Sequence, residues 1–126
     1  PPYLEDVKKE KQEENKKALA KFLAEHPILW NKKYYPVDFD SQQEMSLNYI
    51  QYQIAKTAGQ TAILQWHSKY HACEDFTESE FIELSLAISN YIYPYLRKQE
   101  SIKEKIYTCN NREQIEDIII DYKLDE

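Results

Sequence analysis

The chain has 126 residues, of which 42% are hydrophobic and 30% charged, and its formal net charge is −6. This length suits one domain with a modest core, and the acidic balance argues against nucleic acid as the main partner, because phosphate-binding chains carry a basic patch. The single glycine, Gly59, excludes glycine-rich phosphate loops, and no apolar run approaches the roughly 18 residues that a membrane span needs.

Residues 4 to 25 are predicted to form a helix, because the segment is rich in Glu, Lys, Gln and Ala. Its middle, residues 8 to 17, is polar all round, so we expect the first half to be a solvent-exposed stalk. Pro27 should end the helix, since proline disfavours helix in the residue before it. The end of the helix is expected to dock on the rest of the chain through Leu19, Phe22 and Leu23.

This pattern predicts a charged connector over residues 1–26 and a single compact domain over 27–126. Because the chain starts with Pro-Pro-Tyr and no Met, we expect it to belong to a longer polypeptide. Two short β-rich runs predict a hairpin near 28–37, and a second hairpin is expected near 61–76. A helix over 61–72 is the alternative to that second hairpin, because several apolar residues in it share one helical face.

A helix is predicted over residues 42–58, with Ser41 and Glu44 as a capping box at its start and Gly59 as its stop. At 100° per residue the helix has two apolar stripes on roughly opposite sides. The stripes are Leu47, Ile50 and Ile54 on one side and Met45, Tyr49 and Tyr52 on the other. Either the helix lies between two packing surfaces, or its Tyr-rich face is offered to a partner or a sugar.

The strongest predicted helix covers residues 78–107 and starts at a second capping box, Thr77 with Glu80. Pro94 should kink it or divide it in two. A short C-terminal helix, capped by Asn110, follows. The predicted class is therefore mainly α with two small β-hairpins, an α+β arrangement.

His67, His71 and Cys73 fall within seven residues and are of the types that bind zinc. They are weak candidates for a metal site, because no second cluster supplies a fourth ligand. A Cys–His nucleophile pair is a further alternative. We expect instead the polar tip of a hairpin, with no metal and no cofactor. Cys73 and Cys109 lie too far apart in sequence to indicate a disulfide framework and are expected to be reduced thiols.

Aromatic residues are the best candidates for an interaction surface, since Tyr and Trp are enriched at interfaces. The chain holds 11 tyrosines. The predicted interaction surface consists of Tyr34, Tyr35, Tyr49, Tyr52 and Tyr93.

The order of signals from residue 28 onward carries a resemblance. The signals are a short aromatic hairpin, a Ser-Gln helix start, an Ala-Gly stop, a strand with Trp, a Phe-Thr-x-x-Glu-Phe helix start and an Ile-rich tail. Here they read Trp30-Asn31-Lys32-Lys33-Tyr34, Asp40-Ser41-Gln42, Ala58-Gly59, Leu64-Gln65-Trp66, Phe76-Thr77 with Glu80-Phe81, Ile102-Lys103-Glu104-Lys105-Ile106 and Asn111-Arg112-Glu113-Gln114-Ile115-Glu116-Asp117-Ile118. In this order they resemble a domain family of unknown function that recurs in bacteriophage tail-fibre and tail-associated proteins. The family commonly has Gly in the first hairpin turn, where this chain has Asn31-Lys32-Lys33.

The resemblance implies a non-catalytic structural or assembly module of a phage or prophage tail, because the family has no assigned catalytic residues. Its partners would be tail proteins or the rest of a longer parent chain, and a homo-oligomer is possible. It would be made in the bacterial host cytoplasm and lie in the virion tail; otherwise it would be cytoplasmic. The alternatives are a carbohydrate or host-receptor binding module and a small zinc or Cys–His hydrolase.

Overall fold

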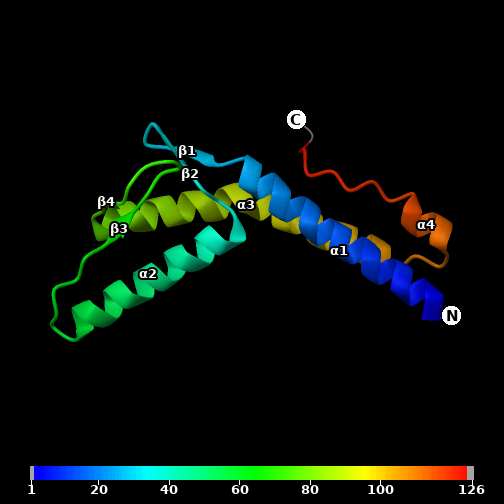
Figure 1. Ribbon diagram of the computed structural model, residues 1–126, viewed down its shortest axis with the longest axis horizontal. Helices are drawn as coiled ribbons and strands as arrows, with labels where there is room; N and C mark the ends of the chain where they lie inside the picture. The colour runs from blue at the N-terminus through cyan, green and yellow to red at the C-terminus, as the bar shows by residue number, and fades with distance from the viewer. Residues whose placement is uncertain (1, 125–126) are drawn as a thin grey trace. The chain divides into compact units, whose positions relative to one another are not determined.

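The computed structural model describes residues 2 to 124 (Figure 1). Over these residues it is 63% helical, with four helices and two small antiparallel sheets. The predicted class, mainly α with two small β-hairpins, is confirmed. Contacts divide the chain into two units. We call residues 23–92 the central unit; the terminal unit combines the residues up to Phe22 with those from Tyr93 onward. No helix within residues 2–124 is long and apolar enough to cross a membrane.

In the terminal unit, α1 (Pro2–Glu25) packs against the second half of α3 (Glu78–Tyr107). Side chains of α1 donate hydrogen bonds to backbone carbonyls of α3, and the partner's number falls as the donor's number rises. The bonds join Lys8 Nζ to Tyr107 O at 2.9 Å, Gln12 Nε2 to Lys103 O at 3.1 Å and Asn15 Nδ2 to Gln99 O at 3.2 Å. The two helices are therefore antiparallel along this contact.

A buried polar pair lies inside the terminal unit. Asn15 is only 1% exposed, and the hydroxyl of Tyr122 donates to its Oδ1. The ring of Phe22 packs 4.8 Å from Tyr95 and 6.4 Å from Tyr122, between centroids. The aliphatic part of this core consists of Leu19, Ile102, Ile106 and Ile115.

The expected exposed stalk in the first half of α1 is wrong. Lys8, Gln12 and Asn15 all bond to α3, because long polar side chains can cap carbonyls on a neighbouring helix while their stems cover apolar surface. Contacts thus group the residues up to Phe22 with those from Tyr93 onward. The sequence-based expectation was a connector over residues 1–26 and a separate domain over 27–126.

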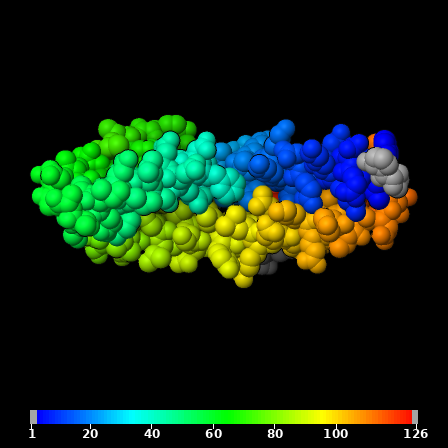
Figure 2. Space-filling model, turned by 90° about the horizontal axis from the view of Figure 1, so that it is seen from below, coloured from blue at the N-terminus to red at the C-terminus, as the bar shows by residue number. Residues whose placement is uncertain are grey.

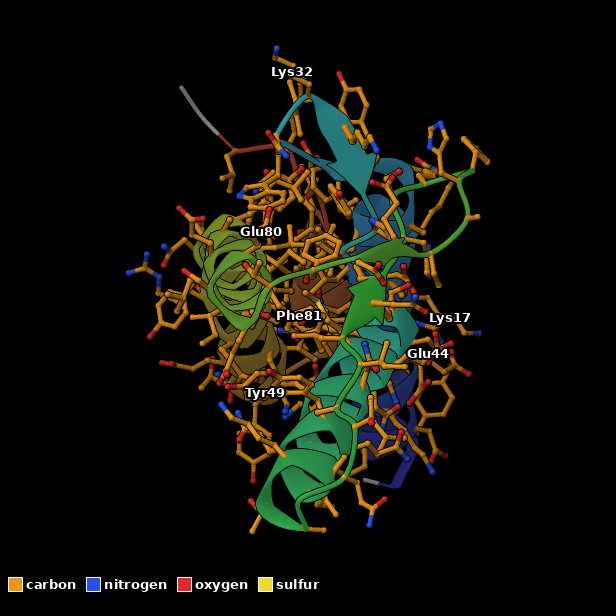
Figure 3. All side chains as sticks on the ribbon, turned by 90° about the vertical axis from the view of Figure 1, so that its left-hand side faces the viewer. Lys17, Lys32, Glu44, Tyr49, Glu80 and Phe81 are labelled. Carbon is orange, nitrogen blue, oxygen red and sulfur yellow. The ribbon has the colours of Figure 1, made fainter. Side chains whose placement is uncertain are left out.

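The first hairpin of the central unit joins β1 (Ile28–Trp30) to β2 (Lys33–Tyr35), with Trp30 opposite Lys33. Asn31 and Lys32 form the turn with φ values of 48° and 68°. Two left-handed residues in a two-residue loop match the type I′ turn, whose twist suits antiparallel strands. Figure 3 shows Lys32 at the tip of this hairpin. The predicted hairpin near 28–37 is confirmed.

The second hairpin is shorter than the prediction over 61–76. Its strands are β3 (Gln65–Trp66) and β4 (Glu74–Asp75), extended by a bond from Phe76 N to Leu64 O at 2.9 Å. The loop between the two strands is held by the first hairpin, because Lys69 N donates to Tyr34 O on β2 at 2.7 Å. The alternative of a helix over 61–72 is wrong.

Helix α2 (Phe39–Thr57) begins three residues earlier than predicted. Asp38 is its N-cap and accepts from Ser41 N at 3.1 Å, so the expected capping box of Ser41 with Glu44 is wrong. A carboxylate at this position satisfies an N-terminal amide and complements the helix dipole. In α4 (Arg112–Glu116) the cap is likewise shifted, to Asn111 instead of Asn110.

Helix α3 starts as predicted. Thr77 N donates to Glu80 Oε1 at 2.9 Å, and Glu80 N donates to Thr77 Oγ1 at 3.1 Å, which is a reciprocal capping box. The helix then continues through Pro94 to Tyr107, so one helix over 78–107 is confirmed and the division into two is wrong. Pro94 cannot donate to the carbonyl of Asn90, but Asn90 is exposed and solvent can satisfy that oxygen.

Aromatic rings form much of the core in the central unit. Phe76 packs on Trp30, Tyr35 and Phe81 at centroid distances of 6.1, 6.3 and 6.1 Å. Phe81 stacks on Tyr49 of α2 at 5.7 Å and 8°, and Figure 3 shows these two rings between the helices. The two hairpins and the two helices of this unit therefore share one aromatic cluster.

Candidate functional site

The histidine and cysteine cluster lies in the loop between β3 and β4. Ser68, 1% exposed, places its Oγ 2.9 Å from Nδ1 of His71 and accepts from the His71 amide through its carbonyl at 3.2 Å. Tyr70, between them, has φ 68°. These contacts close a tight turn. Because Ser68 is buried, its contact with His71 supports the loop from inside.

The three candidate metal ligands do not form a common ligand set. The ring of His67 packs 4.7 Å from Trp66, His71 bonds Ser68, and Cys73 is exposed on the approach to β4. Within residues 2–124 no group of three or more His, Cys, Asp or Glu side chains is placed to hold a metal ion. The geometry is that of a loop anchored to its neighbours.

The tyrosines predicted to form an interaction surface lie in different environments. Tyr35 is 3% exposed and belongs to the aromatic core, so its place on a surface is wrong. Tyr49 and Tyr52 are half-buried and face the start of α3. Tyr34 and Tyr93 are exposed, but Tyr34 belongs to the central unit and Tyr93 to the terminal unit.

Glu78, at the first turn of α3, bonds the Tyr-rich face of α2, which lies inward. Its carboxylate accepts from Tyr49 Oη at 3.0 Å, Gln53 Nε2 at 2.9 Å and Lys56 Nζ at 2.9 Å. The bond from Lys56, followed by those from Tyr49 and Gln53, lowers the pKa of Glu78. Charged hydrogen bonds of this kind fix orientation, so the network holds α2 against α3 through its tyrosines.

The aliphatic stripe of α2 is consequently left uncovered. Leu47, Ile50 and Ile54 expose 53%, 54% and 62% of their surfaces. On α3, Ile82 and Leu86 expose 42% and 59%. Figure 2 shows the surfaces of α2, turquoise to green, and of the first half of α3, yellow-green, side by side on one face. Of the two sequence interpretations of α2, burial between two packing surfaces is wrong, and its tyrosines are not the exposed face.

An apolar groove of about 360 Å³ lies between α2 and α3. Met45, Phe81 and Ile88, all buried, contribute to its lining. Ile50, Ile82 and Leu86 also line it, and the polar residues are all neutral: Gln42, Ser46, Tyr49, Ser85 and Ser89. A second hollow of about 540 Å³ shares Tyr49 and Ile50 and continues along α2 to Ala58. This apolar groove, with its exposed aliphatic edge, is the candidate functional site.

Sequence reasoning identified both stripes of α2 but expected the exposed surface on the Tyr-rich stripe, whose tyrosines are half-buried and bonded to Glu78. One available signal was charge. α3 has no charged residue between Glu83 and Arg97, and α2 has only Asp40, Glu44 and Lys56. In a chain with 30% charged residues, uncharged stretches on two amphipathic helices indicate a surface that is kept apolar.

Comparisons with protein-family models, with curated proteins and with solved structures found no match to this chain.

Proposed function

We propose that this chain is a non-catalytic interaction module that serves in the assembly of a phage or prophage tail, and that the apolar groove is its contact surface. The observation that carries the proposal is a neutral groove lined by three exposed aliphatic side chains, Ile50, Ile82 and Leu86. Exposed apolar patches rimmed by polar residues are typical of protein-binding sites, and amphipathic helices bind in grooves of this kind.

The tail setting is supported by the order of sequence signals between residues 28 and 118, which resembles the tail-associated family. Protein contacts are the activity that such a module needs, and the groove supplies an uncharged surface for them. The partner in this proposal is a tail polypeptide, either the rest of a longer parent chain or a separate component of the tail.

The proposal is tested with phage particles produced in the presence of the wild-type chain or an Ile50→Asp variant. Ile50 is already 54% exposed, so the new carboxylate leaves the core intact while placing a charge in the groove. We expect mass spectrometry of purified particles to find the wild-type chain and at least about tenfold less of the variant, the effect of about 1.4 kcal/mol of lost binding free energy.

The matched control is Gln51→Asp, which adds the same charge to the neighbouring exposed position on α2, outside the groove lining. It should be incorporated like the wild type. Particles that lack the wild-type chain, or that take up Ile50→Asp at the same copy number, would contradict the proposed function.

A further inference from the structure

We infer that the two hairpins of the central unit form a binding site for a small phosphate monoester, in a hollow that is separate from the apolar groove. The hollow has a volume of about 470 Å³ and lies between the tip of the first hairpin and the loop that joins β3 to β4. All of its lining residues belong to the central unit, and none of them lines the apolar groove. A volume of this size is typical of small-molecule sites.

The lysines of the central unit gather at this hollow. Residues 23–92 contain four lysines and no arginine, against nine Asp and Glu residues, so the unit is acidic. Three of the four lysines, Lys32, Lys33 and Lys69, line the hollow. The fourth, Lys56, lies on α2 in an ion pair of its own. Cations that collect in one recess of an otherwise acidic unit raise the local concentration of anions there.

Two of these lysines, Lys32 and Lys69, form no ion pair with any carboxylate that the structure describes. Lys33 differs, because it pairs with Glu74 of β4. Lys69 is half-buried, and its Nζ lies 5.3 Å from the centroid of the Tyr70 ring. A partly buried ammonium group gains more from an added anion than a fully solvated one does, because its charge is less screened.

The type of cation favours phosphate over carboxylate. Arginine pairs with a carboxylate through its planar fork, whereas lysine acts as a point charge with three donors on a flexible stem. A phosphate monoester carries a charge of about −1.5 to −2 at pH 7 and three acceptor oxygens, so separate ammonium groups can bind different oxygens. Lys32, at the tip of the first hairpin (Figure 3), and Lys69, on the loop after β3, come from different elements and both line the hollow. This arrangement suits a compact anion between them.

The hollow also has a surface for the organic part of the ligand. Tyr34 and Tyr70 line it, and they are 55% and 91% exposed. Tyrosine presents a flat apolar ring with a polar end, which suits contact with an organic group next to a phosphate. The two sides of the hollow are joined, because Lys69 N donates to Tyr34 O at 2.7 Å and Lys33 on β2 pairs with Glu74 on β4. A site that is already formed loses little conformational freedom when it binds a ligand.

The test is an NMR titration of the backbone amides at neutral pH and constant ionic strength, with phenyl phosphate, inorganic phosphate and benzoate as the probes. We expect phenyl phosphate to shift the amide signals of Lys32, Lys69 and Tyr70 in a saturable way, with a dissociation constant of about 1 mM or below. Inorganic phosphate leaves the tyrosine rings uncovered, and benzoate carries only a single charge. Each of these two probes should therefore bind at least about fivefold more weakly.

Three variants change the charge of the hollow, and a fourth is the control. Lys32→Gln and Lys69→Gln should each raise the dissociation constant for phenyl phosphate at least about fivefold, while the amide of residue 69 keeps its bond to Tyr34. Glu25, the one carboxylate among the described lining residues, repels an anion, so Glu25→Gln should lower the dissociation constant at least about twofold. A misfolded variant cannot produce such a gain. Lys16→Gln removes an exposed lysine of α1 outside the hollow and should bind like the wild type.

A wild-type chain whose amides around the hollow do not respond to phenyl phosphate would overturn the inference. So would Lys32→Gln and Lys69→Gln variants that bind as tightly as the wild type, or benzoate that binds as tightly as phenyl phosphate. If inorganic phosphate binds as tightly as phenyl phosphate, the assignment to a monoester is wrong and the ligand is free phosphate. None of these results bears on the proposed function, which the incorporation of Ile50→Asp into phage particles decides separately.

Discussion

The two units of this chain hold their helices together in different ways. The terminal unit places a polar pair, Asn15 and Tyr122, in its interior. The central unit has an aromatic core, and its polar network around Glu78 lies at the edge, with Glu78 30% exposed. A buried polar pair must be satisfied within the unit, whereas a network at the edge leaves the opposite side of the helix pair free. The open apolar surface accordingly lies on the central unit.

The largest expected effects come from removing one fully buried aliphatic side chain in each unit. Leu84 and Ile106 are both 0% exposed, and truncation to Ala should lower the free energy of unfolding by about 2–5 kcal/mol. Both tryptophans, Trp30 and Trp66, belong to the central unit, so their fluorescence reports on that unit, while far-ultraviolet circular dichroism reports on the helices of both.

Leu84→Ala should therefore lower the denaturant midpoint seen by fluorescence. Ile106→Ala should lower the midpoint of part of the circular dichroism signal and leave the fluorescence midpoint close to that of the wild type. If both variants shift both signals equally, the two units unfold together in one cooperative transition. The two units would then not be independently stable.

Intermediate effects are expected at the buried polar pair. Tyr122→Phe removes the donor to Asn15 Oδ1 and should lower the free energy of unfolding by about 1–3 kcal/mol, because a buried acceptor loses its partner. Tyr122→Phe combined with Asn15→Leu should cost less than the two single changes added together, as a double-mutant cycle measures. Tyr107→Phe is the control, since Tyr107 is 77% exposed. An equal loss of unfolding free energy in Tyr107→Phe would contradict a stabilising role for the buried pair.

Alkaline unfolding gives the same pair a second measurement. Burial raises the pKa of Tyr122 from 10.0 to about 12. Above pH 10 the unfolded chain releases this proton while the folded chain keeps it, so stability falls as pH rises from 10 to 12. The wild type should lose more stability over this window than Tyr122→Phe does.

The smallest effect is expected at Glu78, whose side chain is 30% exposed. Hydrogen bonds from Lys56, Tyr49 and Gln53 hold its pKa below 4.5. Its contribution to stability is therefore complete above that value and is lost as pH falls through the lowered pKa. In acid titrations followed by tryptophan fluorescence, the wild type should lose slightly more stability than Glu78→Gln does. Glu83→Gln, which removes a carboxylate from an exposed position of the same helix, is the matched control for the change at Glu78.

Local signals in the sequence predicted local structure well. The capping box of Thr77 with Glu80 and the long apolar repeat placed α3 correctly, because both depend only on residues within a few turns of one another. The two apolar stripes of α2 were also found. Which stripe is buried depends on contacts with α3, among them Glu78 and Phe81, which follow α2 by more than 20 residues.

The buried Asn15 shows the same limit. In sequence it belongs to a polar stretch that is typical of an exposed helix, and its partner Tyr122 lies 107 residues away. A polar residue is tolerated at a buried position only when a partner satisfies it, and that partner is set by tertiary structure. The Asp38 cap of α2 was missed for a different reason: Asp38 and Ser41 both satisfy the composition rule for a cap.

The way the terminal unit is joined has a consequence for the order of events during synthesis. The central unit is one continuous stretch of chain, whereas α1 bonds to residues that follow it by 84 to 109 positions. Domains fold as units while the chain grows from its N-terminus, so the central unit can complete its contacts first. The side chain of Asn15 on α1 can form its bonds to Gln99 and Tyr122 only after these two residues have been synthesised. α1 is thus synthesised before the central unit but reaches its partners after that unit has formed, because closing so long a loop is intrinsically slow.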